Sequence, residues 1–323
     1  MKIACLTGAG TAPELMAEAV LALDRVARLH NLHVEETHAT FGGGAFARAG
    51  QSVPPSTRAA ILDADAVLVA GADEPALEEV TADLDLRAQA TRVRFGHHDD
   101  VVVVAPRTED ACEWAAERAF AIAEQRTLRL AAVGDGDWRE LVDDVAAHHD
   151  HVTVEHVAPK LAIPLAAFTA SRFDVVAVSP QWAEPMGEIL AASAAARVAA
   201  HGLLAEHGPS LFVPAPNEAG SDVGRAGAAR PGRLAYGEPG GYALAGAGVV
   251  NPSSMLLAAA TMLDFGLGHP VAASTLAGAV SAALVDGPQT PDLLRRGVGA
   301  TTREFTTRVI AGFQLSQPWG SAA

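Results

Sequence analysis

Short apolar runs rich in valine and isoleucine recur along the chain, and stretches with helical spacing lie between them. Runs of this length are typical of strands that a parallel sheet buries on both faces. They occupy residues 2–6, 66–70, 101–105, 128–133 and 174–178. Apolar residues at three- and four-residue intervals predict helices over residues 13–28, 56–62, 109–125 and 137–147. This alternation predicts an α/β doubly wound architecture.

The chain is long enough to form more than one lobe. Its 323 residues are 50% apolar and only 19% charged, so a sizeable core can be buried and we expect two lobes. Residues 202–252 are rich in glycine, proline and alanine with little periodicity, which predicts an extended irregular segment. Two further helices are predicted after it, over residues 253–265 and 301–313.

Charge and cysteine content exclude several classes of partner. The formal net charge is -15, with the charges interspersed, whereas nucleic-acid binding needs clustered Lys and Arg, so we expect no nucleic-acid partner. No stretch offers about 18 uncharged apolar residues, so we expect no membrane partner. Cys5 and Cys112 are far apart, which fits a reducing compartment and predicts a cytoplasmic location.

A glycine turn follows the first predicted strand. Gly8 and Gly10 lie between that strand and Pro13, which suits a first helical position. The third glycine of a dinucleotide-binding fingerprint is missing. The turn by itself therefore indicates tight backbone geometry more than a phosphate site.

Several segments, in order along nearly the whole chain, resemble the isopropylmalate and isocitrate dehydrogenase family. TGAGTAPELMAEAV is similar to the family's GDGIGPE start, and ILDADAVLVAGADEP to its ADAVLLGAVGGP strand. FDVVAVSPQWAEPMGEI keeps the frame of FDVIVTxNxFGDILSD. Towards the end, NPSSMLLAAATMLDFGLG resembles NPxAxILSAAMML, and TPDLLRRGVGATTREF resembles TxDLGGxxxTxEF. The shared order is more specific than any single motif.

The resemblance implies a two-domain α/β fold of the isopropylmalate dehydrogenase type, with the active-site cleft between the domains. The first, cofactor-side domain would be discontinuous and comprise residues 1–92 and 202–323. The second domain, residues 93–201, would be inserted into it and would carry the metal-side residues and the dimer contacts. A homodimer is implied, and a helical surface over residues 186–198 suits it.

The family's oxidative decarboxylation of a 2-hydroxy acid uses a divalent metal held by three aspartates. At the matching positions this chain has Lys160, Glu184 and Glu188, so the resemblance makes Glu184 and Glu188 the candidate ligands for Mg²⁺ or Mn²⁺. Lys160 is the candidate catalytic residue, although an ammonium has no lone pair for a metal. Either Lys160 pairs with Glu184 or Glu188 and replaces the ion, or all three are solvated.

Other catalytic parts of the family are changed. Where the family writes RENTEGxY and an arm, this chain reads APRTEDACEWAAERAF, and VGDGDWR replaces VDKAN, so the catalytic Tyr and Lys are absent. The resemblance assigns Arg87 and Arg94 to a small carboxylate-bearing ligand, because guanidinium forks match carboxylates. Arg92 or Arg107 could compensate for a third arginine that is lost with the arm.

The family binds a nicotinamide cofactor, and the resemblance implies NAD here. The positions that could still supply hydrogen bonds to it are Thr11, Asn217, Asp222 and Asn251. Pro216 stands where the family has a His beside the adenine. An insertion over residues 226–245 either covers the pocket or forms a surface loop.

Two functions from different classes follow. The first is a non-catalytic homologue that has lost metal- and NAD-dependent decarboxylation and keeps a small-ligand cleft. The alternative is an active NAD(P)-dependent dehydrogenase of a small 2-hydroxy acid with a remodelled site. Losing one general acid or base typically costs about 100- to 10,000-fold in rate, and several are missing, so the sequence favours the first.

Overall fold

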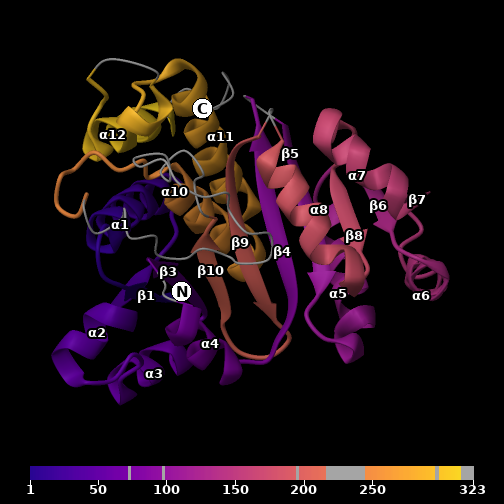
Figure 1. Ribbon diagram of the computed structural model, residues 1–323, viewed down its shortest axis with the longest axis horizontal. Coiled ribbons are helices and arrows are strands. Elements are labelled where there is room, and N and C mark those ends of the chain that lie inside the picture. The colour runs from indigo at the N-terminus through magenta and orange to yellow at the C-terminus, as the bar shows by residue number, and fades with distance from the viewer. Residues whose placement is uncertain (72–73, 97–98, 194–195, 216–243, 295–297, 314–323) are drawn as a thin grey trace, which may run out of the picture.

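The computed structural model describes residues 1–71, 74–96, 99–193, 196–215, 244–294 and 298–313. The predicted α/β class is confirmed: one ten-stranded sheet crosses the molecule, with helices on both faces (Figure 1). The strand order is β2-β1-β3-β10-β9-β4-β5-β8-β6-β7. Within these residues, no helix is both long and apolar enough to cross a membrane.

Parallel strands form both ends of the sheet, and an antiparallel group joins them. One end consists of β1 (Lys2–Thr7), β2 (Glu35–Thr40) and β3 (Ala66–Ala70), with β10 (Ser210–Pro214) parallel to β3. The other consists of β5 (Asp99–Pro106), β6 (Arg129–Val133), β7 (Thr153–Val157) and β8 (Val175–Val178). Between them β9 (Ala196–Ala205) is antiparallel to both β10 and β4 (Leu86–Phe95), and β4 is antiparallel to β5.

One face of the sheet carries a single continuous apolar core. It is formed with helices α1 (Ala12–Leu29), α5 (Cys112–Glu124), α6 (Gly136–Ala146), α10 (Ser253–Thr261), α11 (Pro270–Asp286) and α12 (Thr302–Gly312). A π-helical turn, η4 (Met262–Gly266), continues α10. Both α10 and α11 are apolar around most of their circumference because they lie deep in this core.

The opposite face is divided between two separate apolar clusters. One lies under α3 (Pro55–Leu62) and α4 (Glu74–Ala82), near α2 (Gly42–Ala49). The other lies under α7 (Pro159–Phe168) and α8 (Pro180–Ala192). Between them, β4 and β9 present Gln89, Thr91 and His201, which belong to neither cluster. We call these three residues the polar strip.

Glycines allow two close approaches that fix this arrangement. A Cβ atom at Gly8 would lie 2.0 Å from the carbonyl oxygen of Gly71, so the turn after β1 packs directly on the turn after β3. The ring of Phe212 fills the space beside two further glycines, where a Cβ at Gly202 or Gly266 would lie 2.8 Å or 2.6 Å from it. The glycine at position 8, in the turn after β1, is therefore explained by close backbone packing.

Two sequence-based predictions need correction, and a third stays untested. The irregular segment does not begin at residue 202, because β9 continues to Ala205 and β10 covers Ser210–Pro214. The helical surface expected over residues 186–198 ends at Ala192, where α8 stops before β9. The predicted domain boundaries fall inside the continuous strands β4 and β9, and the division into two domains stays a prediction.

Candidate functional site

Helix α8 carries the two candidate metal ligands and lies over the polar strip. The helix begins after Ser179, and both Glu184 and Glu188 are exposed on it. Gly187 lies one turn after Glu184 on α8, and a Cβ atom there would be 3.9 Å from the Thr91 hydroxyl oxygen. The turn of α8 that bears both carboxylates therefore packs next to Thr91 of the polar strip.

Lys160 lies near the start of α7 and is exposed. Within the described part of the chain, no ion pair joins it to Glu184 or Glu188. The described residues also contain no group of three His, Cys, Asp or Glu side chains that could hold a metal ion. A divalent cation prefers several oxygen ligands at short distances, so this arrangement does not fit the metal that the family uses.

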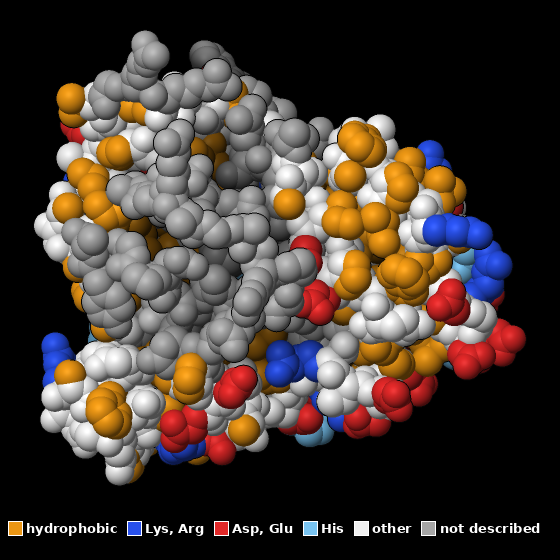
Figure 2. Space-filling view, viewed as in Figure 1, with side chains coloured by type: hydrophobic (Ala, Val, Ile, Leu, Met, Phe, Trp, Pro, Cys, Tyr) orange, Lys and Arg blue, Asp and Glu red, His pale blue; other side chains and the backbone are white. Residues whose placement is uncertain are grey.

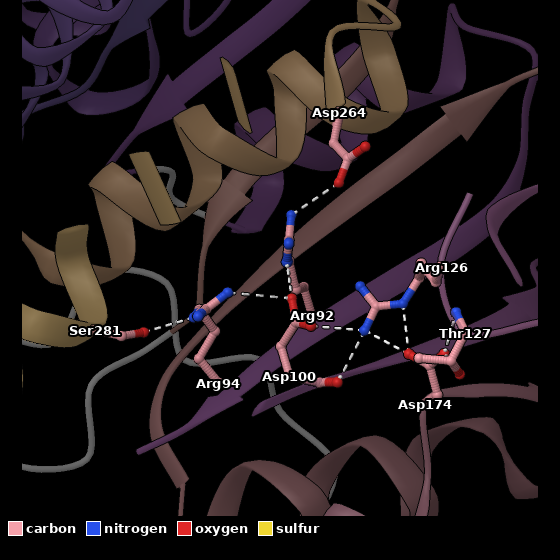
Figure 3. Close-up of polar contacts among 8 residues, drawn as sticks. All are labelled: Arg92, Arg94, Asp100, Arg126, Thr127, Asp174, Asp264 and Ser281. Atoms are coloured by element: carbon pink, nitrogen blue, oxygen red, sulfur yellow. Dashed lines mark hydrogen bonds and ion pairs between the residues drawn. The ribbon is translucent and has the colours of Figure 1, made fainter. Parts of the chain in front are cut away.

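Arg94 lies on the wrong face of the sheet for a site beneath α8. Its guanidinium Nε donates to Ser281 Oγ of α11 over 2.6 Å, and its Nη1 is 3.5 Å from Asp100 Oδ2 (Figure 3). Because side chains alternate along a strand, Thr91 and Arg94 point to opposite faces of β4. The prediction that Arg94 grips a ligand carboxylate together with Arg87 is therefore not supported by its position.

A buried ion network surrounds Arg94. Arg92 donates through Nε to Asp100 over 2.6 Å and through Nη1 to Asp264 of η4 over 3.0 Å. Arg126 donates to Asp100 over 2.6 Å and to Asp174 over 2.6 Å (Figure 3). With three arginines facing three aspartates, the charges balance inside the fold, as buried ions require.

The network perturbs its carboxylates in opposite directions. Burial alone would raise the pKa of Asp100, but Arg92 and Arg126 outweigh it and hold that pKa well below its usual range. Burial raises the pKa of Asp264, even though Arg92 acts against the change. Asp100 is therefore the anionic centre of the network.

Arg87, the other arginine assigned to a ligand, is already paired. Its Nη1 is 2.8 Å from Asp110 Oδ2, and its Nε is 3.3 Å from Glu206 Oε2. A register shift between β4 and β9 falls at this residue. Two carboxylates thus compete with any anion for one guanidinium.

Only part of the predicted cofactor set can be located. Thr11 precedes α1, and its side chain makes no capping hydrogen bond. Asn251 is buried, donates to Asp292 over 3.0 Å and accepts from the backbone N–H of Ser253 over 3.0 Å, so it holds the start of α10. Asn217, Asp222 and residues 226–243 of the 226–245 insertion lie outside the described residues. The described positions do not by themselves form a dinucleotide site.

The polar strip is the feature that the sequence did not reveal. Gln89 Nε2 donates to Thr91 Oγ1 over 3.3 Å, and Thr91 Oγ1 is 3.0 Å from His201 Nδ1. Burial lowers the pKa of His201 to about 4, so the imidazole is neutral at pH 7. The only available signal was a single histidine within the apolar run VAAHGLLA.

Comparison with known proteins decides the family. A profile described as isocitrate/isopropylmalate dehydrogenase matches residues 79–309, which is most of the chain. The chain belongs to the isocitrate/isopropylmalate dehydrogenase family. It is 27% identical to 3-isopropylmalate dehydrogenase of Streptococcus mutans, with 96% of this chain and 99% of that protein covered. The corresponding enzyme of Listeria innocua is 25% identical, with 96% and 97% covered.

Solved structures agree on the fold. A β-decarboxylating dehydrogenase from Thermococcus kodakarensis superposes with a TM-score of 0.76 at 20% identity, covering 97% of this chain and 96% of that one. Isocitrate dehydrogenase from Methylococcus capsulatus gives 0.72 at 17% identity, covering 97% and 99%. The expected isopropylmalate dehydrogenase-like architecture is thereby confirmed.

Proposed function

We propose that this member of the isocitrate/isopropylmalate dehydrogenase family binds a small molecule at the polar strip beneath α8 and does not perform metal- and NAD-dependent oxidative decarboxylation. The observation that carries this proposal is the position of Arg94. Its guanidinium is engaged on the far side of the sheet by Ser281 and Asp100. A substrate carboxylate beneath α8 would lack that partner.

The metal-side residues support the same proposal. Lys160 places an ammonium where the family has a carboxylate, and like charges repel a bound cation. Glu184 and Glu188 remain as two exposed carboxylates, which is fewer ligands than a magnesium site normally uses.

Assembly as a homodimer is part of the proposal. Figure 2 shows hydrophobic side chains gathered over α7 and α8. On α7, Leu161 is 55% exposed and Phe168 is 87% exposed, and large exposed apolar groups that gather on one surface mark interaction sites. We place the protein in the cytoplasm, because both of its cysteines are free thiols.

The test combines ligand-dependent stability with turnover. Thermal unfolding is followed with NAD, NADP, Mg²⁺ and Mn²⁺, singly and combined, in the presence of 3-isopropylmalate or isocitrate, and absorbance reports reduced cofactor. A ligand at 100 times its Kd stabilises the native state by about 2.7 kcal/mol, so binding is detectable. We expect no cooperative stabilisation by metal plus cofactor and no reduced cofactor. Formation of reduced cofactor would establish the active dehydrogenase instead.

A further inference from the structure

The polar strip joins three side chains from two neighbouring strands. Thr91 of β4 lies directly opposite His201 of β9, and Gln89 lies two residues before Thr91 on the same face. Thr91 is 3% exposed and His201 is 8% exposed. The strip is thus a built, nearly buried feature of the sheet and not a set of solvated surface groups.

The hydrogen-bond chain fits the tautomer of His201 that carries its proton at Nε2. Gln89 donates to Thr91 Oγ1, which leaves the hydroxyl hydrogen available for His201 Nδ1, 3.0 Å away. A neutral imidazole that accepts at Nδ1 carries its proton at Nε2. His201 therefore presents an N–H donor at the far end of the chain.

That donor has no acceptor within the described residues. Among the described residues, no hydrogen bond or ion pair uses His201 Nε2, and this nitrogen is not one of the unpartnered side-chain atoms that are sealed from solvent. The side-chain oxygen of Gln89 likewise accepts no hydrogen bond from the described residues and is not sealed from solvent. One donor and one acceptor are thus left on the face that α8 adjoins.

The surrounding charges select against an anion. Arg92 and Arg94 are held on the opposite face of the sheet, and Arg87 is paired with two carboxylates. Glu184 and Glu188 project from α8 without an ion pair among the described residues. These two carboxylates outnumber the single exposed ammonium of Lys160 on α7, so a carboxylate ligand would meet a net negative charge, whereas an uncharged polar group would not be repelled.

We propose that the strip recognises an uncharged carboxamide, with His201 Nε2 donating to the amide oxygen and Gln89 Oε1 accepting from the amide nitrogen. This assignment rests on the proposed function and names the ligand class of the same site. An amide presents the acceptor and donor that complement the two free groups, and leaving either group unpaired on burial costs about 1–3 kcal/mol.

The experiment compares benzamide with benzoate, which share a shape and differ in charge. Nitrogen NMR on protein labelled at histidine follows the His201 ring during each titration. That signal is assigned among the 12 histidines by its loss in His201→Phe. We expect a neutral Nε2–H ring whose signal shifts with benzamide, and at least tenfold weaker binding of benzoate.

Two variants separate recognition from folding. Thr91→Val removes the partner of Nδ1 and should weaken benzamide binding about tenfold, and His201→Gln should restore part of the affinity lost in His201→Phe. Backbone spectra show whether each variant is folded. Equal or tighter binding of benzoate, or an unchanged His201 signal with benzamide, overturns the amide assignment. Turnover with metal and NAD would instead contradict the proposed non-catalytic function. The amide assignment and the proposed function can therefore fail independently.

Discussion

The guanidinium of Arg92 donates to the carboxylate of Asp264 over 3.0 Å, which joins strand β4 to the π-helical turn η4. The same guanidinium donates to Asp100 and lies 5.8 Å from the ring centroid of Phe265. All of these partners are on one face of the sheet. Arg92 is therefore unable to replace a missing substrate arginine on the opposite face.

Removing the anionic centre of this network should destabilise the fold strongly. Asp100→Asn keeps the shape but leaves Arg92, Arg94 and Arg126 buried with only Asp174 and Asp264 to balance them, and losing one partner of a buried ion pair costs about 3–5 kcal/mol. Urea unfolding measures the change. Asp24→Asn, which breaks the exposed Arg28–Asp24 pair, is the matched control and should change stability little. Similar effects of both substitutions would contradict the network's role.

His201 should make the protein less stable in mild acid. Its pKa is about 4 in the native state against an ordinary 6.5, so between these values only the unfolded chain takes up the proton. Stability is full above pH 6.5 and falls with decreasing pH, by about 2 kcal/mol at pH 5. Urea unfolding at pH 7.5 and pH 5, compared with His201→Phe, checks this. In His201→Phe, the free energy of unfolding should fall less between pH 7.5 and pH 5 than in the wild type. An identical fall in both proteins refutes the prediction.

His149 should act in the opposite direction. Burial works to lower its pKa, but hydrogen bonds to Glu117 and Glu124 raise it overall, and the ring stacks on Phe120 with centroids 4.9 Å apart. A raised pKa gives stability that is present below about pH 6.5 and is lost as pH rises through the native value. His149→Gln should therefore destabilise more at pH 5.5 than at pH 8.5. A pH-independent loss would show that only the stack matters.

The first turn should not tolerate a methyl group. A Cβ at Gly8 would lie 2.0 Å from the Gly71 carbonyl oxygen, and backbone cannot move aside as a flexible side chain does. Gly8→Ala should cost at least about 1–3 kcal/mol. At Gly136, the first residue of α6, a Cβ meets nothing within 4 Å, so Gly136→Ala should be neutral or stabilising. Thermal unfolding of both variants decides.

Dimer formation should depend on the apolar surface of α7. Phe168 is 87% exposed there, so Phe168→Asp should place a charge in the interface and shift sedimentation towards the monomer. Val271→Asp is the control, because Val271 is 69% exposed on α11, away from α7. An unchanged sedimentation coefficient for Phe168→Asp would exclude this surface.

Apolar strands and amphipathic helices could be read from the sequence, and β1, β3, β5, β6 and β8 lie where predicted. The central strands could not. β4 reads LRAQATRVRF, and its arginines argue against a buried strand unless their carboxylate partners are known, one of which comes from a distant segment. Asp264 lies 172 residues from Arg92, so the pairing is invisible to local patterns.

The candidate site was predictable only in part. Family resemblance located Glu184 and Glu188, and the structure places them on one helix beside the polar strip. The role of Arg94 stays a prediction, and its direction depends on strand alternation, which turns Thr91 and Arg94 to opposite faces of β4. His201 matched no motif, since its role depends on the register that sets it opposite Thr91.

The ring of Phe212 packs directly against Gly202 and Gly266. These three positions, which are distant in sequence, therefore share one fixed packing volume. A homologue that gains a side chain at either glycine must shrink residue 212, and one that shrinks residue 212 first opens a void. Evolutionary change at these three sites is therefore expected to be correlated, and such covariation would trace the β9, β10 and η4 junction through diverging lineages.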